Sequence, residues 1–377
     1  MRRCRTCLLP DTKPDLHFDE TGECSACRAY KARPEIDWDA RKQELLNLLE
    51  RHNGRCIVPS SGGKDSTYQV LMLKELGADP LVVTATTCHL TEIGRKNIDN
   101  LARYATTIEV TPNRSVRAKL NRLGLEMVGD ISWPEHVSIF TTPFRVAVQT
   151  GIPLIFYGEN PQNQYGGPQG SEQAKEMTRR WVSEFGGFLG LRPQDLIGMD
   201  GITERDMRDY MPPDIIAMST TGGDNSSHRA GVEAHFLGQY IPWDSHHNAE
   251  VARQAGMIQQ LPSIANWWPH ENLDNAQTGI HDFGMYLKYG FGRACSQLSV
   301  DIRAGRIRRD HALKELDKRE GKFPEVYAGV KVEDMLERIG MTERELWNTL
   351  DKFTNNSIHP VGPPCDTAEE LIERLRK

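Results

Sequence analysis

The residues best suited to chemistry form one short loop. They follow an apolar run, Cys56–Val58, and precede a predicted helix that ends before Gly77. Two glycines let the backbone approach an anion closely, and backbone amides at a helix N-terminus attract negative charge. The lysine adds a cation, the serines add hydroxyl donors, and the aspartate can approach Mg²⁺. We therefore predict a phosphate-binding loop that consists of Ser61, Gly62, Gly63, Lys64, Asp65 and Ser66.

The spacing of this loop is not that of a Walker A motif, which needs GxxxxGK[ST]. Simple capping of the following helix by Ser61 is the alternative interpretation. The position between an apolar run and a helix favours phosphate binding over capping alone.

The cysteines indicate a metal site at the start of the chain. Half of the eight cysteines fall in the first 27 residues as two CxxC pairs. Two such pairs separated by about 15–20 residues are typical of a four-thiolate zinc site. Such a closed site leaves no open coordination position, so the expected Zn²⁺ is structural. Two unrelated buried or redox-active pairs are the alternative to a site formed by Cys4, Cys7, Cys24 and Cys27.

The elements that must position these residues alternate along the chain. Short apolar runs separated by helical patterns occur at residues 56–58, 81–84, 107–110, 152–157 and 235–241. This alternation predicts an α/β fold, a parallel sheet with helices on both faces. Beyond about residue 260 the pattern becomes mostly helical and charged. We therefore expect a zinc ribbon at 1–33, the sheet domain at 34–260 and a helical substrate or partner region at 261–377.

Composition excludes some classes of function. The 377 residues carry a net charge of −6, which argues against a chain that coats nucleic acid or an anionic membrane. The first residues lack the apolar stretch of a secretory signal, and no run approaches the ~20 apolar residues of a membrane span. We expect a cytoplasmic protein with no nucleic-acid partner and no membrane insertion.

Two other places carry candidate binding residues. Gly158, Glu159 and Asn160 follow the fourth predicted strand, at the edge where doubly wound sheets bind ligands. Glu159 could hold Mg²⁺ or orient a substrate; a plain loop carboxylate is the alternative. Lys288 and Arg293 flank a glycine-rich aromatic stretch and suit a sugar-nucleotide diphosphate, although a solvated helix end explains them nearly as well.

The loop after a buried strand resembles the PP-loop of the ATP pyrophosphatase superfamily. Within that superfamily, the whole chain resembles the N-acetyl sugar amidotransferases of bacterial surface-polysaccharide synthesis. The matching pieces occur in order from end to end: the two CxxC pairs, the PP-loop, Gly129-Asp130 followed by Trp133 and His136, and the runs at 153–160, 164–167, 236–244, 286–294 and 301–306.

This resemblance implies a five-stranded parallel, doubly wound PP-loop (HUP-like) domain. Adenine is expected near the end of the second strand, at Thr84, Ala85 and Thr86. Members cleave ATP between the α- and β-phosphates, which adenylates a carbonyl-type oxygen before a nitrogen or sulfur nucleophile displaces AMP. We expect Lys64, Asp65 and Glu159 to act in catalysis, with Asp65 or Glu159 holding Mg²⁺, and Gly158 to contact the nucleotide.

The reaction implied is the conversion of an acetamido group on a nucleotide-activated N-acetyl sugar to an acetamidino group. It belongs to the synthesis of lipopolysaccharide O-antigen or another surface glycan. Ammonia is expected from a glutaminase and a cyclase-like partner of the histidine-biosynthesis type. Gln164 departs from the family pattern, which has an acidic residue there, and this puts a metal or base role in doubt. The expected sugar contacts are Trp133, His136, Asn160, Tyr165, Lys288 and Arg293.

Two other classes of function compete with this one. A tRNA-thiolating PP-loop enzyme can also carry zinc ribbons, but it needs a basic surface and reactive cysteines near the loop. The net charge of −6 opposes that interpretation. A non-catalytic nucleotide sensor with a zinc module is the second rival, and it would have no need for Lys64 and Asp65.

Overall fold

The computed structural model describes residues 1–161, 175–177, 181–182, 185–213, 231–359 and 373. Tyr165 and Gln164, both singled out in the sequence, lie outside the described residues. Within the described part, no helix combines the length and the apolar character needed to cross a membrane.

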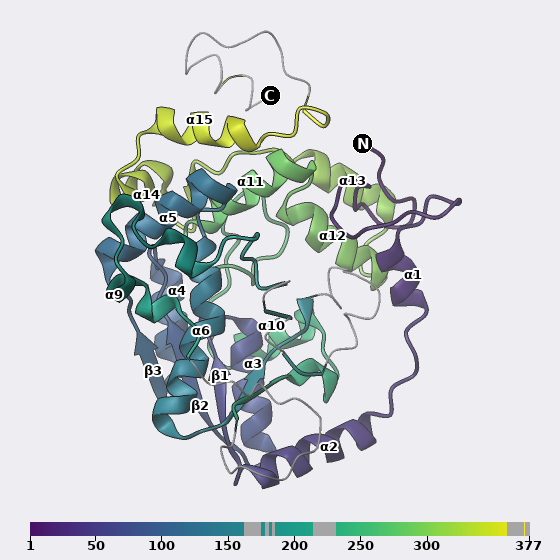
Figure 1. The fold of residues 1–377 in the computed structure, drawn as a ribbon. Coiled ribbons are helices and arrows are strands. Elements are labelled where there is room, and N and C mark those ends of the chain that lie inside the picture. Colours follow the sequence, from purple (N-terminus) through teal and green to yellow (C-terminus); the bar gives the residue numbers. More distant parts are fainter. Residues whose placement is uncertain (162–174, 178–180, 183–184, 214–230, 360–372, 374–377) are drawn as a thin grey trace.

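A five-stranded sheet forms the centre of the fold, and all of its strands are parallel (Figure 1). The strand order is β3-β2-β1-β4-β5, so the direction of winding reverses between β1 and β4. This confirms the predicted α/β class and all five predicted strands. The strands are β1 (Arg55–Pro59), β2 (Asp79–Ala85), β3 (Thr107–Val110), β4 (Leu154–Tyr157) and β5 (Glu233–Phe236).

The fifth strand is shorter than its sequence indicated. It ends at Phe236, and the next three residues form a 3-10 turn, η5 (Leu237–Gln239). The apolar residues Tyr240 and Ile241 extend the run in sequence, but they enter the core from beyond the turn rather than from the strand. An apolar run alone therefore does not reveal where the strand stops.

Helices cover both faces of the sheet because alternate strand residues point to opposite sides. Cys56 and Val58 pack in the core with α2, α3 and the C-terminal end of α4. Ile57, between them, packs in the opposite core with α6. The helices of this domain are α2 (Trp38–Arg51), α3 (Lys64–Glu75), α4 (Glu92–Leu101), α5 (Arg114–Val128), α6 (Trp133–Thr150) and α10 (Ser245–Gln254).

Short helical turns fill the described part of the stretch between β4 and β5. They pack Leu191, Leu196 and Tyr210 against α5 and α6. These turns are η2 (Pro193–Leu196), η3 (Met199–Gly201), α9 (Glu204–Met207) and η4 (Arg208–Tyr210).

The C-terminal region is mostly helical, as predicted. Its helices α11, α14 and α15 enclose a core that also includes Leu125 of α5 and Ile131. The sequence did not indicate the small antiparallel hairpin of β6 (Val326–Tyr327) and β7 (Val330–Lys331). The helices are α11 (Thr278–Tyr289), α12 (Arg293–Arg303), α13 (Arg309–Asp317), α14 (Val332–Ile339) and α15 (Glu343–Phe353).

The N-terminal ribbon, which includes α1 (Ser25–Lys31), lies beside α12 and α13 (Figure 1). Its cysteines share one buried core with residues of these two helices, among them Leu298 and Leu316. The Arg309 guanidinium donates to the carbonyl oxygens of Cys4 and Cys7 at 3.0 Å. The ribbon is thus attached to α12 and α13 of the C-terminal region rather than to the sheet that follows it in sequence.

A buried ion pair joins α5 to α6. The Arg117 guanidinium donates to Glu135 Oε1 at 2.9 Å and to Tyr210 Oη at 2.9 Å. The backbone N–H of Cys88, in the loop after β2, also donates to Glu135 at 3.3 Å. The pair therefore ties the loop at the end of β2 to the helices behind it.

We expect Arg117→Met to destabilise the protein by about 3–5 kcal/mol, because it leaves the Glu135 carboxylate buried without its cation. The measurement is the free energy of unfolding in urea. Arg253→Met is the matched control, since Arg253 pairs with Glu250 on the surface. That change should leave the free energy of unfolding nearly unchanged, because solvent screens an exposed ion pair. Equal losses in the two variants would contradict the role given to the buried pair.

Candidate functional site

The phosphate loop lies at the carboxyl end of β1, next to the point where the strand order reverses. Helix α3 begins at Lys64, with Gly63 as its N-cap residue. Gly62 has a φ of +76°, and a Cβ atom there would stand 2.6 Å from the backbone nitrogen of Ile98. Only glycine fits this close approach of α4, so the second residue of the loop is set by packing as well as by ligand binding.

Hydrogen bonds within the loop hold its shape. The Gly62 N–H donates to Ser60 Oγ at 2.9 Å, and Ser60 Oγ donates to Ser66 Oγ at 2.8 Å. Ser66 Oγ in turn donates to the carbonyl of Gly63 at 3.1 Å. The amide of Gly62 and the hydroxyl of Ser66 therefore have partners inside the loop, whereas the sequence predicted both as phosphate donors. Ser61 has an exposed side chain.

Lys64 is the central charge of the site. Its side chain is only 5% exposed, and its Nζ lies 2.5 Å from Asp65 Oδ2 and 3.3 Å from Glu271 Oε1. Burial alone would lower the pKa of the ammonium, but the two carboxylates more than offset it and raise the pKa above its usual value. The lysine is thus a fixed cation at the N-terminus of α3.

Sequence reasoning missed Glu271. It follows the run Trp267-Trp268-Pro269-His270 in a loop of the C-terminal region, with no motif that indicates a ligand. Gln297 of α12 donates to Glu271 Oε2 at 3.0 Å and so orients the other oxygen toward Lys64. The C-terminal region therefore contributes directly to the phosphate loop.

The end of β4 forms the opposite side of the site, as predicted for Gly158, Glu159 and Asn160. The Gln69 amide, from α3, pairs with both Phe156 O at 2.9 Å and Gly158 N at 3.3 Å. Burial, followed by the nearby Asp65 carboxylate, raises the pKa of Glu159 to about 8. Asn160 is buried beside it.

Three carboxylates thus act electrostatically on one lysine: Asp65, Glu159 and Glu271. Oxygen donors of this kind suit Mg²⁺, which binds one or two carboxylates together with the phosphates of a nucleotide. Asn248 of α10 donates to Asp65 Oδ1 at 3.2 Å and holds that side chain in place. The donor set fits a Mg²⁺ ion held by Asp65 or Glu159, which would neutralise phosphate charge.

The predicted adenine contacts lie at the carboxyl end of β2, two strands away from β4. The Thr84 hydroxyl is buried and has no hydrogen-bond partner among the described residues. Thr86 Oγ1 lies 3.2 Å from Thr111 Oγ1 at the end of the neighbouring strand. Ala85 lies between them and is partly exposed.

Two of the residues expected to contact the sugar, Trp133 and Lys288, make contacts inside the protein instead. Trp133 is fully buried among residues of the α5–α6 core, and its indole N–H donates to Phe188 O at 3.2 Å. Its indole therefore has no face open to a substrate. The Lys288 ammonium donates to the carbonyls of Val128 and Gly129, at 2.7 and 2.9 Å, and so caps the end of α5.

His136 lies within reach of the buried carboxylate of Asp130, and so does His281 from α11. The sequence predicted a ligand contact for His136 but did not indicate His281. Burial lowers the pKa of His136, but the neighbouring Asp130 carboxylate raises it by more, so the pKa lies above its usual value.

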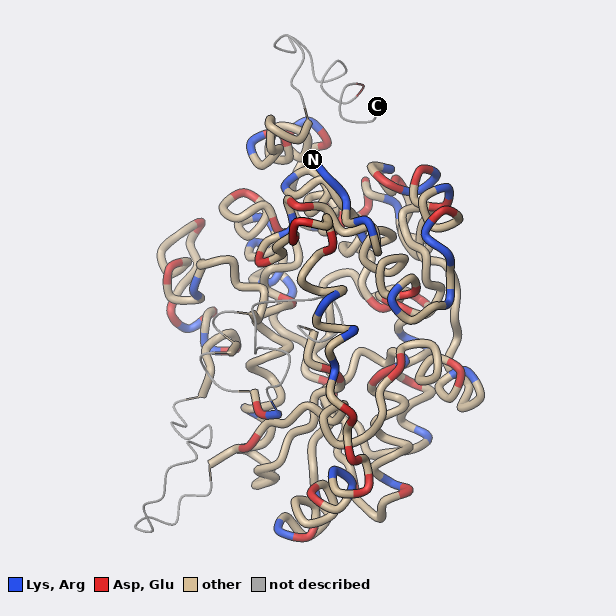
Figure 2. Tube along the Cα trace, turned by 90° about the vertical axis from the view of Figure 1, so that its right-hand side faces the viewer, with Lys and Arg blue, Asp and Glu red and all other residues tan. Residues whose placement is uncertain are grey.

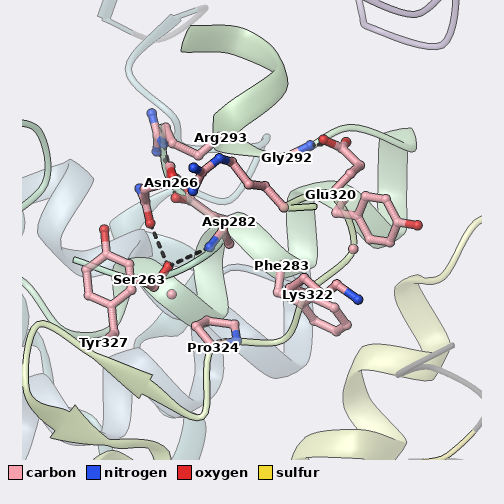
Figure 3. A pocket seen from close by; sticks show the side chains of 15 residues that line it. Ser263, Asn266, Asp282, Phe283, Gly292, Arg293, Glu320, Lys322, Pro324 and Tyr327 are labelled. Atoms are coloured by element: carbon pink, nitrogen blue, oxygen red, sulfur yellow. Dashed lines mark hydrogen bonds and ion pairs between the residues drawn. The ribbon is translucent and has the colours of Figure 1, made fainter. Parts of the chain in front are cut away.

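Arg293 lies at the start of α12 and forms a two-point ion pair with Asp282, at 2.7 and 3.1 Å. Both residues line a small pocket of the C-terminal region, together with Glu320 and Tyr327 (Figure 3). Although burial raises the pKa of Glu271, the charge of Arg293 also helps to lower it, after the larger effect of Lys64. A cation in this position is compatible with the predicted phosphate contact.

The four N-terminal cysteines come together as the spacing predicted. All four are buried, and their sulfur atoms lie within 4.8 Å of one another. The Cys4 and Cys27 sulfurs are 4.0 Å apart, and those of Cys7 and Cys24 are 3.7 Å apart. Tetrahedral thiolates at about 2.3 Å from Zn²⁺ have separations close to these. The backbone N–H of Cys24 donates to Cys4 Sγ at 3.2 Å, as expected around a thiolate ligand.

Comparison with known proteins finds a similarity to one family in the C-terminal region. Residues 263–365 match the family described as LPS biosynthesis protein WbpG-like, C-terminal domain. Among curated proteins, none matches this chain.

Among solved structures, the chain is similar to NMN synthetase from Francisella tularensis, with 15% sequence identity and a TM-score of 0.26. The similarity covers 46% of this chain and 81% of that chain. A similarity of this size carries no information about the reaction of this chain. The matched C-terminal region reaches the phosphate loop through Glu271, whose carboxylate contacts Lys64.

Proposed function

We propose that this protein is an ATP-dependent amidotransferase of surface-glycan synthesis. It converts an acetamido group of a nucleotide-activated N-acetyl sugar to an acetamidino group and releases AMP and pyrophosphate. The observation that carries the proposal is the buried Lys64, at the carboxyl edge of the sheet, between Asp65 and the Glu271 of the WbpG-like region. The description of that family as lipopolysaccharide biosynthesis supports the glycan part of the proposal.

The chemistry explains why ATP is needed. An acetamido carbonyl is a poor electrophile, and its oxygen is a very poor leaving group. Attack of that oxygen on the α-phosphate forms an O-adenylyl imidate and releases pyrophosphate; ammonia then adds to the imidate carbon and AMP leaves. In this proposal Lys64 and the amides at the start of α3 stabilise the charge that grows on the departing pyrophosphate.

The protonation state of the described cysteines near the sheet argues against a sulfur-transfer reaction. Burial raises the pKa of Cys56 to about 12 and that of Cys88 to about 11, so neither is a thiolate at neutral pH. Basic and acidic residues are also interspersed along the described trace (Figure 2). A tRNA partner would need a basic face.

Ammonia must come from elsewhere, because neutral NH₃ is scarce at physiological pH. We propose that a glutaminase and a cyclase-like partner deliver it. High external ammonium should replace these partners in vitro, and glutamine-driven turnover by this chain alone would contradict the idea.

The position of the attacking oxygen gives a direct test. With ¹⁸O in the acetamido carbonyl, ATP and ammonium, we expect the label in AMP, because that oxygen bonds to the α-phosphorus. Mass spectrometry of the separated products is the measurement. AMP should also equal the amidine in amount. Label found in water or pyrophosphate would rule out adenylation of the carbonyl oxygen.

Lys64→Ala should lower kcat by about 10²–10³-fold, since preorganised charge on a leaving group is lost. Sugar binding, measured by calorimetry, should change little. Lys74→Ala is the control, because Lys74 lies on the same helix and its Nζ donates to Tyr104 O at 2.6 Å on the surface. A Lys64 variant with unchanged turnover would remove the loop from the mechanism.

We also propose that the four clustered thiolates bind one structural Zn²⁺. Cys24→Ser should abolish this site and loosen the ribbon from α12 and α13, with a large fall in the melting temperature. Metal analysis of the purified protein should find zinc. Iron with a cluster spectrum, or a four-cysteine site that takes up no metal, would show the assignment to be wrong.

A further inference from the structure

Three side chains from two separate parts of the chain meet at the N-terminal end of α6. Asp130 precedes α6, His136 lies in its first turn, and His281 lies in the first turn of α11. The Nδ1 atom of His281 is 2.7 Å from Asp130 Oδ1, and the Nδ1 atom of His136 is 3.1 Å from Asp130 Oδ2. One ligand atom from each residue lies within 4.8 Å of the others.

The contact of His136 is not an ordinary hydrogen bond. Its Nδ1 atom is buried and has no hydrogen-bond partner in the described part of the chain, although Asp130 Oδ2 is only 3.1 Å away. The carboxylate is therefore close to this nitrogen but poorly aligned with it, and a buried ring nitrogen gains free energy from a well-aligned partner. A metal ion beside the carboxylate would accept the nitrogen lone pair directly.

The carboxylate between the two rings is placed as a ligand would be. Asp130 is 2% exposed, and the backbone N–H of Ser132 donates to its Oδ1 at 2.8 Å. Such a donor orients a ligand carboxylate from behind. The nearby Lys288 ammonium donates its hydrogen bonds to two backbone carbonyls, and it acts on the Asp130 carboxylate only through its charge.

We propose that Asp130, His136 and His281 form a second metal site, which takes a divalent transition metal such as Zn²⁺. Two imidazoles and one carboxylate suit such ions, and three protein ligands leave at least one coordination position open. The side chains of His136 and His281 are about one-quarter exposed, at 26% and 25%, so water or a small ligand can reach the ion. This inference is independent of the proposed reaction.

The test is the number of zinc ions held by the full chain after loading with Zn²⁺ and dialysis. We expect about two per chain in the wild type, one in each site, and about one in His281→Gln. His311→Gln is the control, because His311 is exposed on α13, with 62% of its side chain accessible, and should leave the count unchanged. Circular dichroism establishes that each variant is folded.

Replacement by Co²⁺ separates the two sites without a variant. A four-thiolate site gives intense sulfur-to-cobalt charge-transfer bands, whereas a site of two histidines and one aspartate gives only weak visible bands. We expect the wild type to take up cobalt beyond the point at which the charge-transfer bands saturate. His136→Gln should remove this second phase if His281→Gln does not fold. Saturation of all uptake with the thiolate bands, or an unchanged zinc count in the folded histidine variants, would overturn the proposal.

Discussion

The buried ammonium of Lys64 is the interaction on which the functional half of the structure depends. A charge that is 5% exposed must be paired, and Lys64 is paired with Asp65 from its own helix and Glu271 from the C-terminal region. The second partner holds the C-terminal region against the phosphate loop. The site is therefore complete only when both parts of the chain are folded together. A bound nucleotide would compete with these carboxylates for the same cation.

Asp301 of α12 explains how Glu271 reaches its place. The indole N–H groups of Trp267 and Trp268 both donate to Asp301 Oδ2, at 2.8 and 2.9 Å. The other carboxylate oxygen, Oδ1, accepts a hydrogen bond from Arg306 Nε at 2.8 Å and lies 2.9 Å from His246 Nε2. His246 lies at the start of α10. One buried carboxylate thus fixes the loop before Glu271 and the helix that carries Asn248. The paired tryptophans and Arg306 thus hold the edge of the site in place.

The helices α11 and α12 connect three centres of the molecule. The start of α11 supplies His281 to the cluster at Asp130, and α12 supplies Gln297 to Glu271. The opposite side of α12 packs against the cysteine ribbon. A ribbon held in one shape would therefore stabilise the helices that position ligand-binding residues. A zinc ion bound by the four cysteines would act in this structural way.

Local patterns were enough to predict the five strands, the place of the loop between β1 and α3, and the four-cysteine cluster. Strand periodicity, the Gly-Gly turn and the CxxC spacing each act over a few residues, so the sequence carries them directly. Glu271, His281 and the structural role of Trp133 could not be read this way. Their places depend on how α11 and α12 pack against the sheet domain, and burial and pairing between distant segments decide that packing. Only the tertiary structure shows which charges meet.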